Sequence, residues 1–230
     1  MKKMYKSPGQ TFIGACFILV RKQENSVVFL GTAFLVHEKG YLLSAAHIIG
    51  DDLENLMVAR AKYPEDFSKL SLDEVSDVGI DVKKIDAYHN VAVLKLQKDF
   101  LIETPDYLIG QVDNLTLGTG LINIGFPYGH QDMHILAVRS SVLSAKAKLN
   151  NGTKLLLFDS MVHDGMTGGP LVSIEDKRIV EIVIGRFSPL EDGGDFNRGN
   201  NYPEYDTSMS YAISIEYGYN LLKDLKIEIS

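Results

Sequence analysis

The stretch that decides the fold of this chain is Gly165-Met166-Thr167-Gly168-Gly169-Pro170. Glycines on both sides of a hydroxyl residue let the backbone turn sharply and approach a ligand closely. Consecutive backbone N–H groups in such a turn can point at a single oxyanion. Taken alone, the stretch is interpreted equally well as a glycine-rich turn that happens to contain one polar residue.

Two further stretches, at 42–47 and 89–96, become informative when they are considered together with the first. Leu42-Leu43-Ser44-Ala45-Ala46-His47 places a histidine after a run of small residues, and histidine is the side chain best suited to exchange a proton near neutral pH. A lone histidine after a strand is nevertheless more often structural than catalytic. His89-Asn90-Val91-Ala92-Val93-Leu94-Lys95-Leu96 predicts a strand that opens with two polar residues, and by itself it is ordinary.

Most of the remaining chain consists of short apolar segments separated by polar turns, which predicts an all-β sandwich or barrels. Ser214 can cap a C-terminal helix in which Tyr217, Leu221 and Leu225 recur at helical spacing. We expect strands at residues 12–21, 26–36, 56–61, 82–87, 91–96, 120–124, 135–145, 154–158, 171–173, 178–185 and 209–213.

Size and charge narrow the class of protein. The 230 residues are 45% hydrophobic and 23% charged, enough for a sizeable core and not typical of disorder. The formal net charge of −7 argues against a nucleic-acid footprint and against a polybasic membrane patch. The apolar run at 12–20 is too short to span a bilayer, and charged residues follow it where a cleavage site would lie, so we expect a buried first strand.

Cysteine usage bears on the compartment. Cys16 is the only cysteine, so no intrachain disulfide can form. Disulfides are typical of secreted proteins and rare in the cytosol, so the lack of one favours a reducing, cytoplasmic location. Because Cys16 lies in an apolar run, we expect a buried small hydrophobe rather than a reactive thiol.

Taken together and in this order, the motifs resemble those of trypsin-like serine peptidases, most closely the bacterial HtrA-type branch. The resemblance runs from about residue 12 to residue 226. It rests on the histidine motif, on the Gly-Met-Thr-Gly-Gly-Pro stretch, and on weaker matches at 90–95, 124–127 and 211–214. It leaves no room in this sequence for a following PDZ domain.

The resemblance implies a fold and a set of roles. The fold is a single trypsin-like domain over 1–230, with two six-stranded antiparallel β-barrels at about 12–110 and 111–213 and a C-terminal α-helix at about 214–226. His47 takes the position of the general base, Thr167 that of the nucleophile, and Asn90 that of the carboxylate that orients the histidine. The backbone N–H groups of Gly165 and Thr167 take the positions of the oxyanion hole.

Two of the three catalytic positions depart from the family pattern. Asparagine at 90 keeps the shape of aspartate without its charge, and its amide can select the wrong histidine tautomer; the corresponding change in a serine protease lowers turnover by about 10⁴. Threonine at 167 keeps a hydroxyl, but its methyl group restricts χ1 and crowds the point of attack. Known threonine nucleophiles mostly use a free N-terminal amine as base, and Thr167 is internal.

The sequence contains few indications of substrate specificity. By the same resemblance the primary substrate pocket is bordered by Met161 and by Ile184, Gly185 and Arg186, which suggests an apolar site. The long acidic segment 188–206 could select basic substrates or bind a ligand such as calcium, although its spacing matches no EF-hand loop. We expect no cofactor and no metal.

Two functions therefore remain open at the level of sequence. One is a peptidase with an altered His47–Asn90–Thr167 triad, slow or conditional in hydrolysing peptide bonds. The other is an inactive pseudoprotease that binds peptides or proteins in the retained cleft. The expected partner in both is a peptide or protein, with no nucleic acid and no membrane, and the sequence does not say whether an activating protein supplies a missing group.

Overall fold

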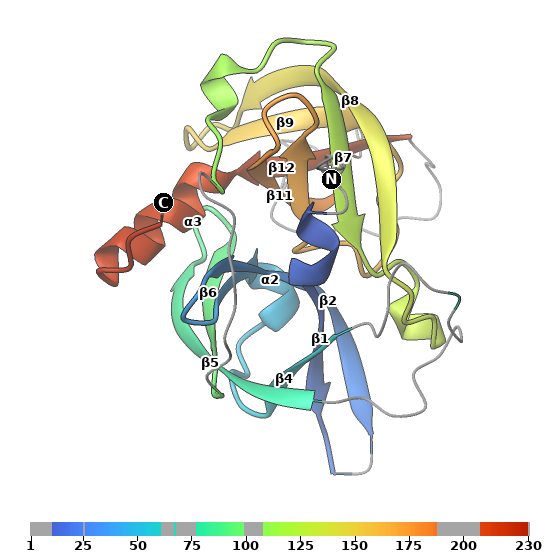
Figure 1. The fold of residues 1–230 in the computed structure, drawn as a ribbon, viewed down its shortest axis with the longest axis vertical. Coiled ribbons are helices and arrows are strands. Elements are labelled where there is room, and N and C mark those ends of the chain that lie inside the picture. Colours follow the sequence, from blue (N-terminus) through green and yellow to red (C-terminus); the bar gives the residue numbers. More distant parts are fainter. Residues whose placement is uncertain are drawn as a thin grey trace, which may run out of the picture.

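The computed structural model describes residues 11–24, 26–60, 67, 77–98, 108–187 and 208–229. Within these ranges the chain forms two closed antiparallel six-stranded barrels followed by a C-terminal helix, α3 (Ile215–Asp224). Figure 1 shows one barrel above the other, with α3 at their side. The predicted all-β double barrel with a C-terminal helix is confirmed. The residue boundaries predicted for the single domain and its two barrels stay predictions.

The first barrel has the strand order β1-β2-β3-β6-β5-β4. A short helix, α2 (Ala46–Ile49), follows its third strand. The 3-10 turn η1 (Ile13–Ala15) occupies residues that were expected to be extended. The strands are β1 (Cys16–Lys22), β2 (Val27–His37), β3 (Tyr41–Ala45), β4 (Leu56–Ala59), β5 (Asp77–Asp86) and β6 (Val91–Leu96).

The second barrel has the strand order β10-β11-β12-β9-β8-β7. Two further 3-10 turns accompany it, η2 (Val112–Asn114) before its first strand and η3 (Gly129–Gln131) after it. The strands are β7 (Gly120–Gly125), β8 (Ala137–Lys148), β9 (Lys154–Asp159), β10 (Pro170–Ser173), β11 (Arg178–Arg186) and β12 (Met209–Ser214).

Apolar side chains form three buried clusters that explain this architecture. One lies in the first barrel around Leu42 and Leu94, and another lies in the second barrel around Phe158 and Val183. The third contains residues of both barrels and of α3, including Phe34 and Leu222, so it joins the barrels. The barrels are therefore held together by a continuous apolar interface, and segments far apart in sequence meet at a fixed geometry.

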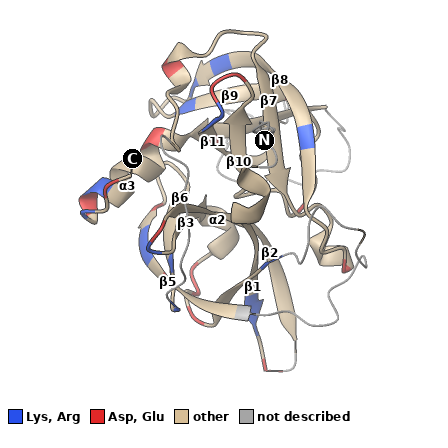
Figure 2. Cartoon of the chain, viewed as in Figure 1, with Lys and Arg blue, Asp and Glu red and all other residues tan. Residues whose placement is uncertain are grey.

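The helix α3 begins as its sequence predicts and packs across both barrels. Ser214 accepts a hydrogen bond from the Glu216 N–H at 3.3 Å, which caps the helix. Lys84 of β5 donates to Asp224 at 2.7 Å at the other end of the helix. Figure 2 shows charged positions on α3 and basic positions on β8. No helix among the described residues is long and apolar enough to cross a membrane.

Candidate active site

The loop that contains Thr167 is held against the first barrel by Thr32 of β2, a residue to which the sequence analysis assigned no role. The Thr32 N–H donates to the Thr167 carbonyl at 2.8 Å. The Thr32 hydroxyl donates to the Gly165 carbonyl at 2.7 Å and accepts from the Phe126 N–H at 3.2 Å. The Ser44 hydroxyl in turn donates to the Thr32 carbonyl at 2.7 Å. A buried threonine thus fixes the loop relative to β3 and the helix that carries His47.

Gly165 and Gly168 are needed for the close approach of this loop to its neighbours. Their φ angles of +100° and +84° lie in the left-handed region that favours glycine. A Cβ atom on Gly165 would lie 2.3 Å from the Phe126 carbonyl oxygen. One on Gly168 would lie 2.2 Å from the Thr32 carbonyl oxygen. The glycine pattern is therefore required by the turn and by the packing.

Two main-chain N–H groups in this loop, those of Gly165 and Thr167, are uncommitted, meaning that they donate to no acceptor among the described residues. The Asp164 carbonyl accepts a hydrogen bond from the Tyr128 N–H at 2.8 Å, which orients the peptide plane that carries the Gly165 N–H. The N–H groups of Met166, Gly168 and Gly169 are all used inside the protein. Among the described residues, the N–H groups of Gly165 and Thr167 donate to no protein acceptor. These are the two donors expected to face an oxyanion.

His47 lies on α2 and contacts Asn90 directly. The His47 main-chain N–H donates to Asn90 Oδ1 at 2.9 Å, and the Asn90 carbonyl accepts from the Ala46 N–H at 3.1 Å. Asn90 adopts a φ of +58°, a left-handed conformation that asparagine tolerates better than most residues. The local backbone of Asn90 thus serves to hold the helix that presents the imidazole.

The amide of Asn90 meets His47 with its nitrogen as well as its oxygen. Asn90 Nδ2 lies 2.8 Å from His47 Nδ1, and Oδ1, which also accepts from the main-chain N–H, lies 3.1 Å from the same ring atom. An amide NH2 group can only donate. The shorter contact therefore favours Nδ1 as an acceptor, which places the proton of a neutral imidazole on Nε2. In that tautomer Nε2 has no lone pair with which to accept a proton.

Burial lowers the pKa of His47 below its ordinary value. Asn90 Oδ1, 3.1 Å from Nδ1, can accept a hydrogen bond from the protonated ring, and this contact opposes the shift only in part. The imidazole is consequently neutral at neutral pH. Within the described part of the chain no carboxylate contacts its Nδ1, because Asn90 occupies the position that would carry one. His47 is therefore neutral, as a general base must be before it accepts a proton. It lacks the neighbouring carboxylate that would stabilise the imidazolium formed afterwards.

The Thr167 hydroxyl has a main-chain partner. Its Oγ1 donates to the Ile184 carbonyl at 3.1 Å. Ile184 lies where the register between β11 and β12 shifts, between the pairs Val183–Ala212 and Gly185–Tyr211. This β-bulge adds one unpaired residue to the strand, and its carbonyl is the one that accepts the threonine proton.

The four residues predicted to border the substrate pocket differ in how deeply they are buried and in what they contact. Ile184 is fully buried in the cluster that joins the barrels, and Gly185 is buried beside it. Met161 is half-buried, and its carbonyl accepts a hydrogen bond from Arg139 at 2.9 Å. Arg186 is half-buried and lies 4.0 Å from Asp164, so a cation and an anion stand at the end of β11 nearest the Thr167 loop. The acidic segment 188–206 lies outside the described residues.

Neither nearby histidine nor Asp86 replaces the missing carboxylate. Asp86 ends β5 and bonds to the main chain and ring of His89, with Oδ2 at 2.6 Å from Nδ1. The His89 ring stacks on Tyr217 of α3 at 3.9 Å between centroids. His163 instead contacts the Tyr128 hydroxyl at 2.8 Å. These side chains support the loops around the site.

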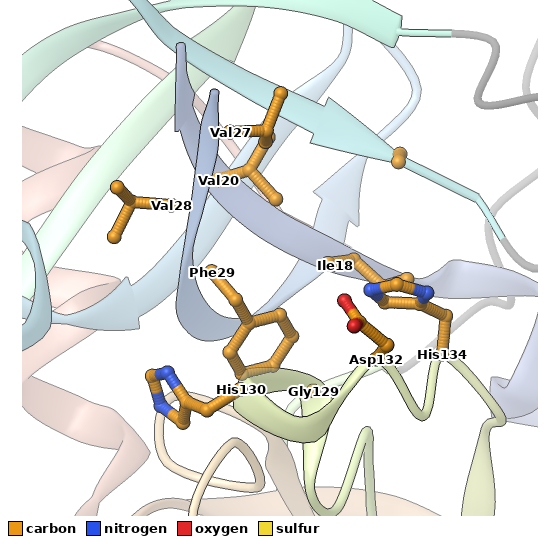
Figure 3. Close-up of a pocket in the computed structure, with 10 residues that line it drawn as sticks. Ile18, Val20, Val27, Val28, Phe29, Gly129, His130, Asp132 and His134 are labelled. Carbon is orange, nitrogen blue, oxygen red and sulfur yellow. The ribbon is translucent and has the colours of Figure 1, made fainter. Parts of the chain in front are cut away.

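A cavity of about 440 Å³ adjoins the loop on the side of η3. Figure 3 shows Phe29 of β2 between His130 on one side and Asp132 and His134 on the other. The Phe29 ring also lies against Gly129 and Gly165, where Cβ atoms would overlap it. The cavity wall is thereby in direct contact with the loop that carries the two uncommitted N–H donors.

Comparison with known proteins agrees with this geometry. The family model described as a trypsin-like peptidase domain matches residues 31–182. The chain therefore belongs to the trypsin-like peptidase family, and the resemblance to the HtrA-type branch is supported by the relatives that follow.

The curated relatives include proteins named "Probable periplasmic serine endoprotease DegP-like". Those of Pseudomonas fulva (strain 12-X) and Halomonas elongata are each 25% identical over 200 residues, which is 86% of this chain and 35% of theirs. The chain thus spans about a third of the length of these relatives. Among solved structures, the HtrA-type protease AlgW with tripeptide has a TM-score of 0.69 at 19% identity, over 95% of this chain and 62% of that one. AlgW with decapeptide has the same TM-score at 18% identity, over 96% of this chain and 66% of that one.

The prediction of a cytoplasmic location is wrong by this comparison, since the relatives are named as periplasmic enzymes. The inference depended on the single cysteine. Cys16 is buried, and burial raises the pKa of its thiol. A single inert thiol forms no disulfide in either compartment, so it carries no information about redox conditions.

Proposed function

We propose that this protein is a pseudoprotease of the trypsin-like family that binds peptides in the retained cleft without cleaving them in its resting state. The observation that carries the proposal is the hydrogen bond from Thr167 Oγ1 to the Ile184 carbonyl. A hydroxyl nucleophile must pass its proton to a base, whereas this proton is directed at a main-chain oxygen. The contact between the Asn90 amide and His47 Nδ1 supports the same conclusion.

Peptide binding is supported by the edge of β11 near the site. Strand β10 begins at Pro170, which pairs with Ile182, so β10 does not extend alongside residues 184–186. An extended peptide can add to such an edge through main-chain hydrogen bonds. The printed descriptions of two similar structures name a tripeptide and a decapeptide, which is consistent with a peptide ligand here. The names of the relatives favour a periplasmic location.

A conditional peptidase is the second candidate, and the uncommitted N–H groups of Gly165 and Thr167 favour it. An oxyanion site has no evident use in a protein that only binds peptides. A peptide that pairs with β11 would present an N–H to the Ile184 carbonyl, in competition with the Thr167 hydroxyl. Its arrival would release the hydroxyl to rotate towards His47, and hydrolysis would then depend on substrate binding.

A library experiment separates the two candidates. Immobilised native protein and the Thr167→Ala variant are incubated with a peptide library, and bound and released peptides are identified by mass spectrometry. We expect both proteins to retain the same intact peptides, because Thr167→Ala removes a hydroxyl without filling the cleft. Cleavage products that appear with native protein and disappear with Thr167→Ala would establish the conditional peptidase. Retention of no peptides by either protein would refute both candidates.

The pH titration of His47 tests the arrangement around the imidazole. Because its pKa is lowered by burial, the unfolded chain binds this proton more tightly than the folded protein does. The contribution of His47 to stability is therefore present above pH 6.5 and is lost as the pH falls through the folded-state pKa. We expect an NMR midpoint below 6.5 in the native protein and a higher midpoint in Asn90→Asp, where a carboxylate stabilises the imidazolium. Equal midpoints in the two proteins would contradict the contact between residues 47 and 90.

A further inference from the structure

A second cavity, of about 200 Å³, lies between β8, β9 and η2 and has a buried glutamate in its wall. Glu181 of β11 is fully buried, and neither of its carboxyl oxygens has a hydrogen-bond partner among the residues that the structure describes. The Leu156 N–H interacts with the carboxyl and opposes the rise of its pKa, but it does not reach hydrogen-bond distance and angle. A buried carboxyl without a hydrogen-bond partner is destabilising, and more so if it is ionised, so its presence calls for an explanation.

The walls around Glu181 are apolar. Val112, Leu155 and Leu156 line the cavity beside the carboxyl, and all three are buried. A cavity of this size is smaller than the roughly 300–1,000 Å³ that encloses a drug-sized ligand. It suits one aliphatic chain of the length of a single amino-acid side chain.

The mouth of the cavity is basic. Lys148 and Lys154 lie directly opposite each other on β8 and β9, a like-charge pair that is unfavourable unless an anion lies nearby. Lys154 is neutralised by Asp113 at 3.0 Å and Glu216 at 3.2 Å. Lys148 forms no ion pair with any described residue. Its charge acts on the carboxyl of Asp113 at longer range, so an anionic group at the mouth would lie beside a lysine that has no ion-pair partner among the described residues.

We propose that this cavity binds an aliphatic amine that also carries a carboxylate, as lysine does, with its ammonium group on Glu181 and its carboxylate at Lys148. The ammonium group supplies the hydrogen-bond donors and the opposite charge that the buried carboxyl lacks. The acidic Glu181 would meet the ammonium end of the ligand, and the basic Lys148 would meet its carboxylate end. In 6-aminohexanoate and in a lysine at a peptide C-terminus these two charges cancel, which lets the ligand pass the lysines at the mouth; free lysine carries an additional α-ammonium group. The site lies about 10 Å along β11 from Ile184, and the proposal is independent of peptide cleavage.

Proton release gives the site a characteristic signature. Burial raises the pKa of Glu181, so its carboxyl keeps a proton to higher pH than an exposed glutamate and must release that proton when an ammonium group arrives. The other charged or titratable groups near it are Asp113 on η2, Lys146 and Lys148 on β8, Lys154 on β9, and Glu216 and Tyr217 on α3. Binding is expected to release one proton and to strengthen with pH by about tenfold per unit while Glu181 is protonated in the empty site.

Calorimetry with 6-aminohexanoate as the probe, in two buffers of different ionisation enthalpy, tests the proposal. We expect binding to native protein, proton release near one, and about 10- to 100-fold weaker binding without proton release in Glu181→Gln. Hexylamine, which lacks the carboxylate, should bind more weakly than the probe, and hexanoate, which lacks the ammonium group, should not bind. Lys148→Glu, an exposed substitution that leaves Glu181 in place, should abolish the difference between 6-aminohexanoate and hexylamine.

The same assay identifies the source of the ligand. Free L-lysine, a short peptide ending in lysine, and that peptide with an amidated C-terminus are compared. Binding of free lysine but not of the peptide identifies a small metabolite, whereas binding of the peptide that amidation abolishes identifies a protein C-terminus. No binding of 6-aminohexanoate to native protein would overturn the proposal. Binding that is unchanged in a folded Glu181→Gln variant would overturn it as well.

Discussion

The double variant Asn90→Asp/Thr167→Ser is expected to hydrolyse peptides at a rate about 10⁴-fold above that of the native protein. The expectation comes mainly from position 90. The Asn90 NH2 now lies 2.8 Å from His47 Nδ1 and favours the tautomer that cannot accept a proton. A carboxylate can accept from both the His47 main-chain N–H and the Nδ1–H, and the reverse change in a serine protease lowers turnover by about 10⁴.

Position 167 contributes through rotation of the hydroxyl. The Thr167 side chain is held by its hydrogen bond to Ile184 and by the restricted χ1 of a β-branched residue. Serine lacks the methyl group, so its Oγ can leave the Ile184 carbonyl and turn towards His47. The uncommitted N–H groups of Gly165 and residue 167 remain in place because they belong to the main chain.

Asn90→Asp/Thr167→Ala is the matched control, since it has the same carboxylate and the same loop but no hydroxyl. Cleavage is measured by mass spectrometry on the peptides retained by native protein. The single variants show how the gain is divided, and we expect less from Thr167→Ser than from Asn90→Asp. If the double variant cleaves no faster than its alanine control, the cleft is not arranged for acyl transfer, and the family resemblance does not extend to its chemistry.

The sequence predicted the fold because its motifs occur in a fixed order at fixed spacing, but it did not reveal every strand. β3 (Tyr41–Ala45) was not among the expected strands. Its interior is buried on both faces, with Leu42 in the core of the first barrel and Leu43 in the cluster that joins the barrels. A short continuous apolar run has no period-two pattern, so periodicity alone does not identify it as a strand.

Sequence patterns also did not identify the residues that hold the Thr167 loop and hydroxyl in place, nor the buried glutamate of the second cavity. Thr32 looks like any threonine in a β-strand, and its bonds reach Gly165 and Phe126, 133 and 94 positions away. The partner of the Thr167 hydroxyl depends on a bulge at Ile184, which no local motif encodes. Glu181 lies in an apolar strand, and its lack of a partner becomes visible only when the barrel has closed.

Gly165→Ala is expected to lower the free energy of unfolding by about 2–5 kcal/mol and to abolish peptide binding. A non-glycine residue in the left-handed region costs about 1–2 kcal/mol. The added Cβ would also lie 2.3 Å from the Phe126 carbonyl oxygen and 2.7 Å from the Phe29 ring, which forces the loop or its neighbours to move. Because Thr32 binds the Gly165 carbonyl, this movement would also misalign both uncommitted N–H groups.

Gly118→Ala separates backbone strain from crowding. Gly118 has a φ of +88°, close to the +100° of Gly165, and a Cβ atom there would have nothing within 4 Å. We therefore expect only the conformational part, about 1–2 kcal/mol, in chemical denaturation of Gly118→Ala, with peptide binding unchanged. The difference between the two variants measures how tightly the loop is packed against Phe29 and Phe126. If Gly165→Ala and Gly118→Ala lowered the free energy of unfolding equally, the loop around Gly165 would accommodate a Cβ atom without additional strain. That result would contradict a rigid, preorganised oxyanion site.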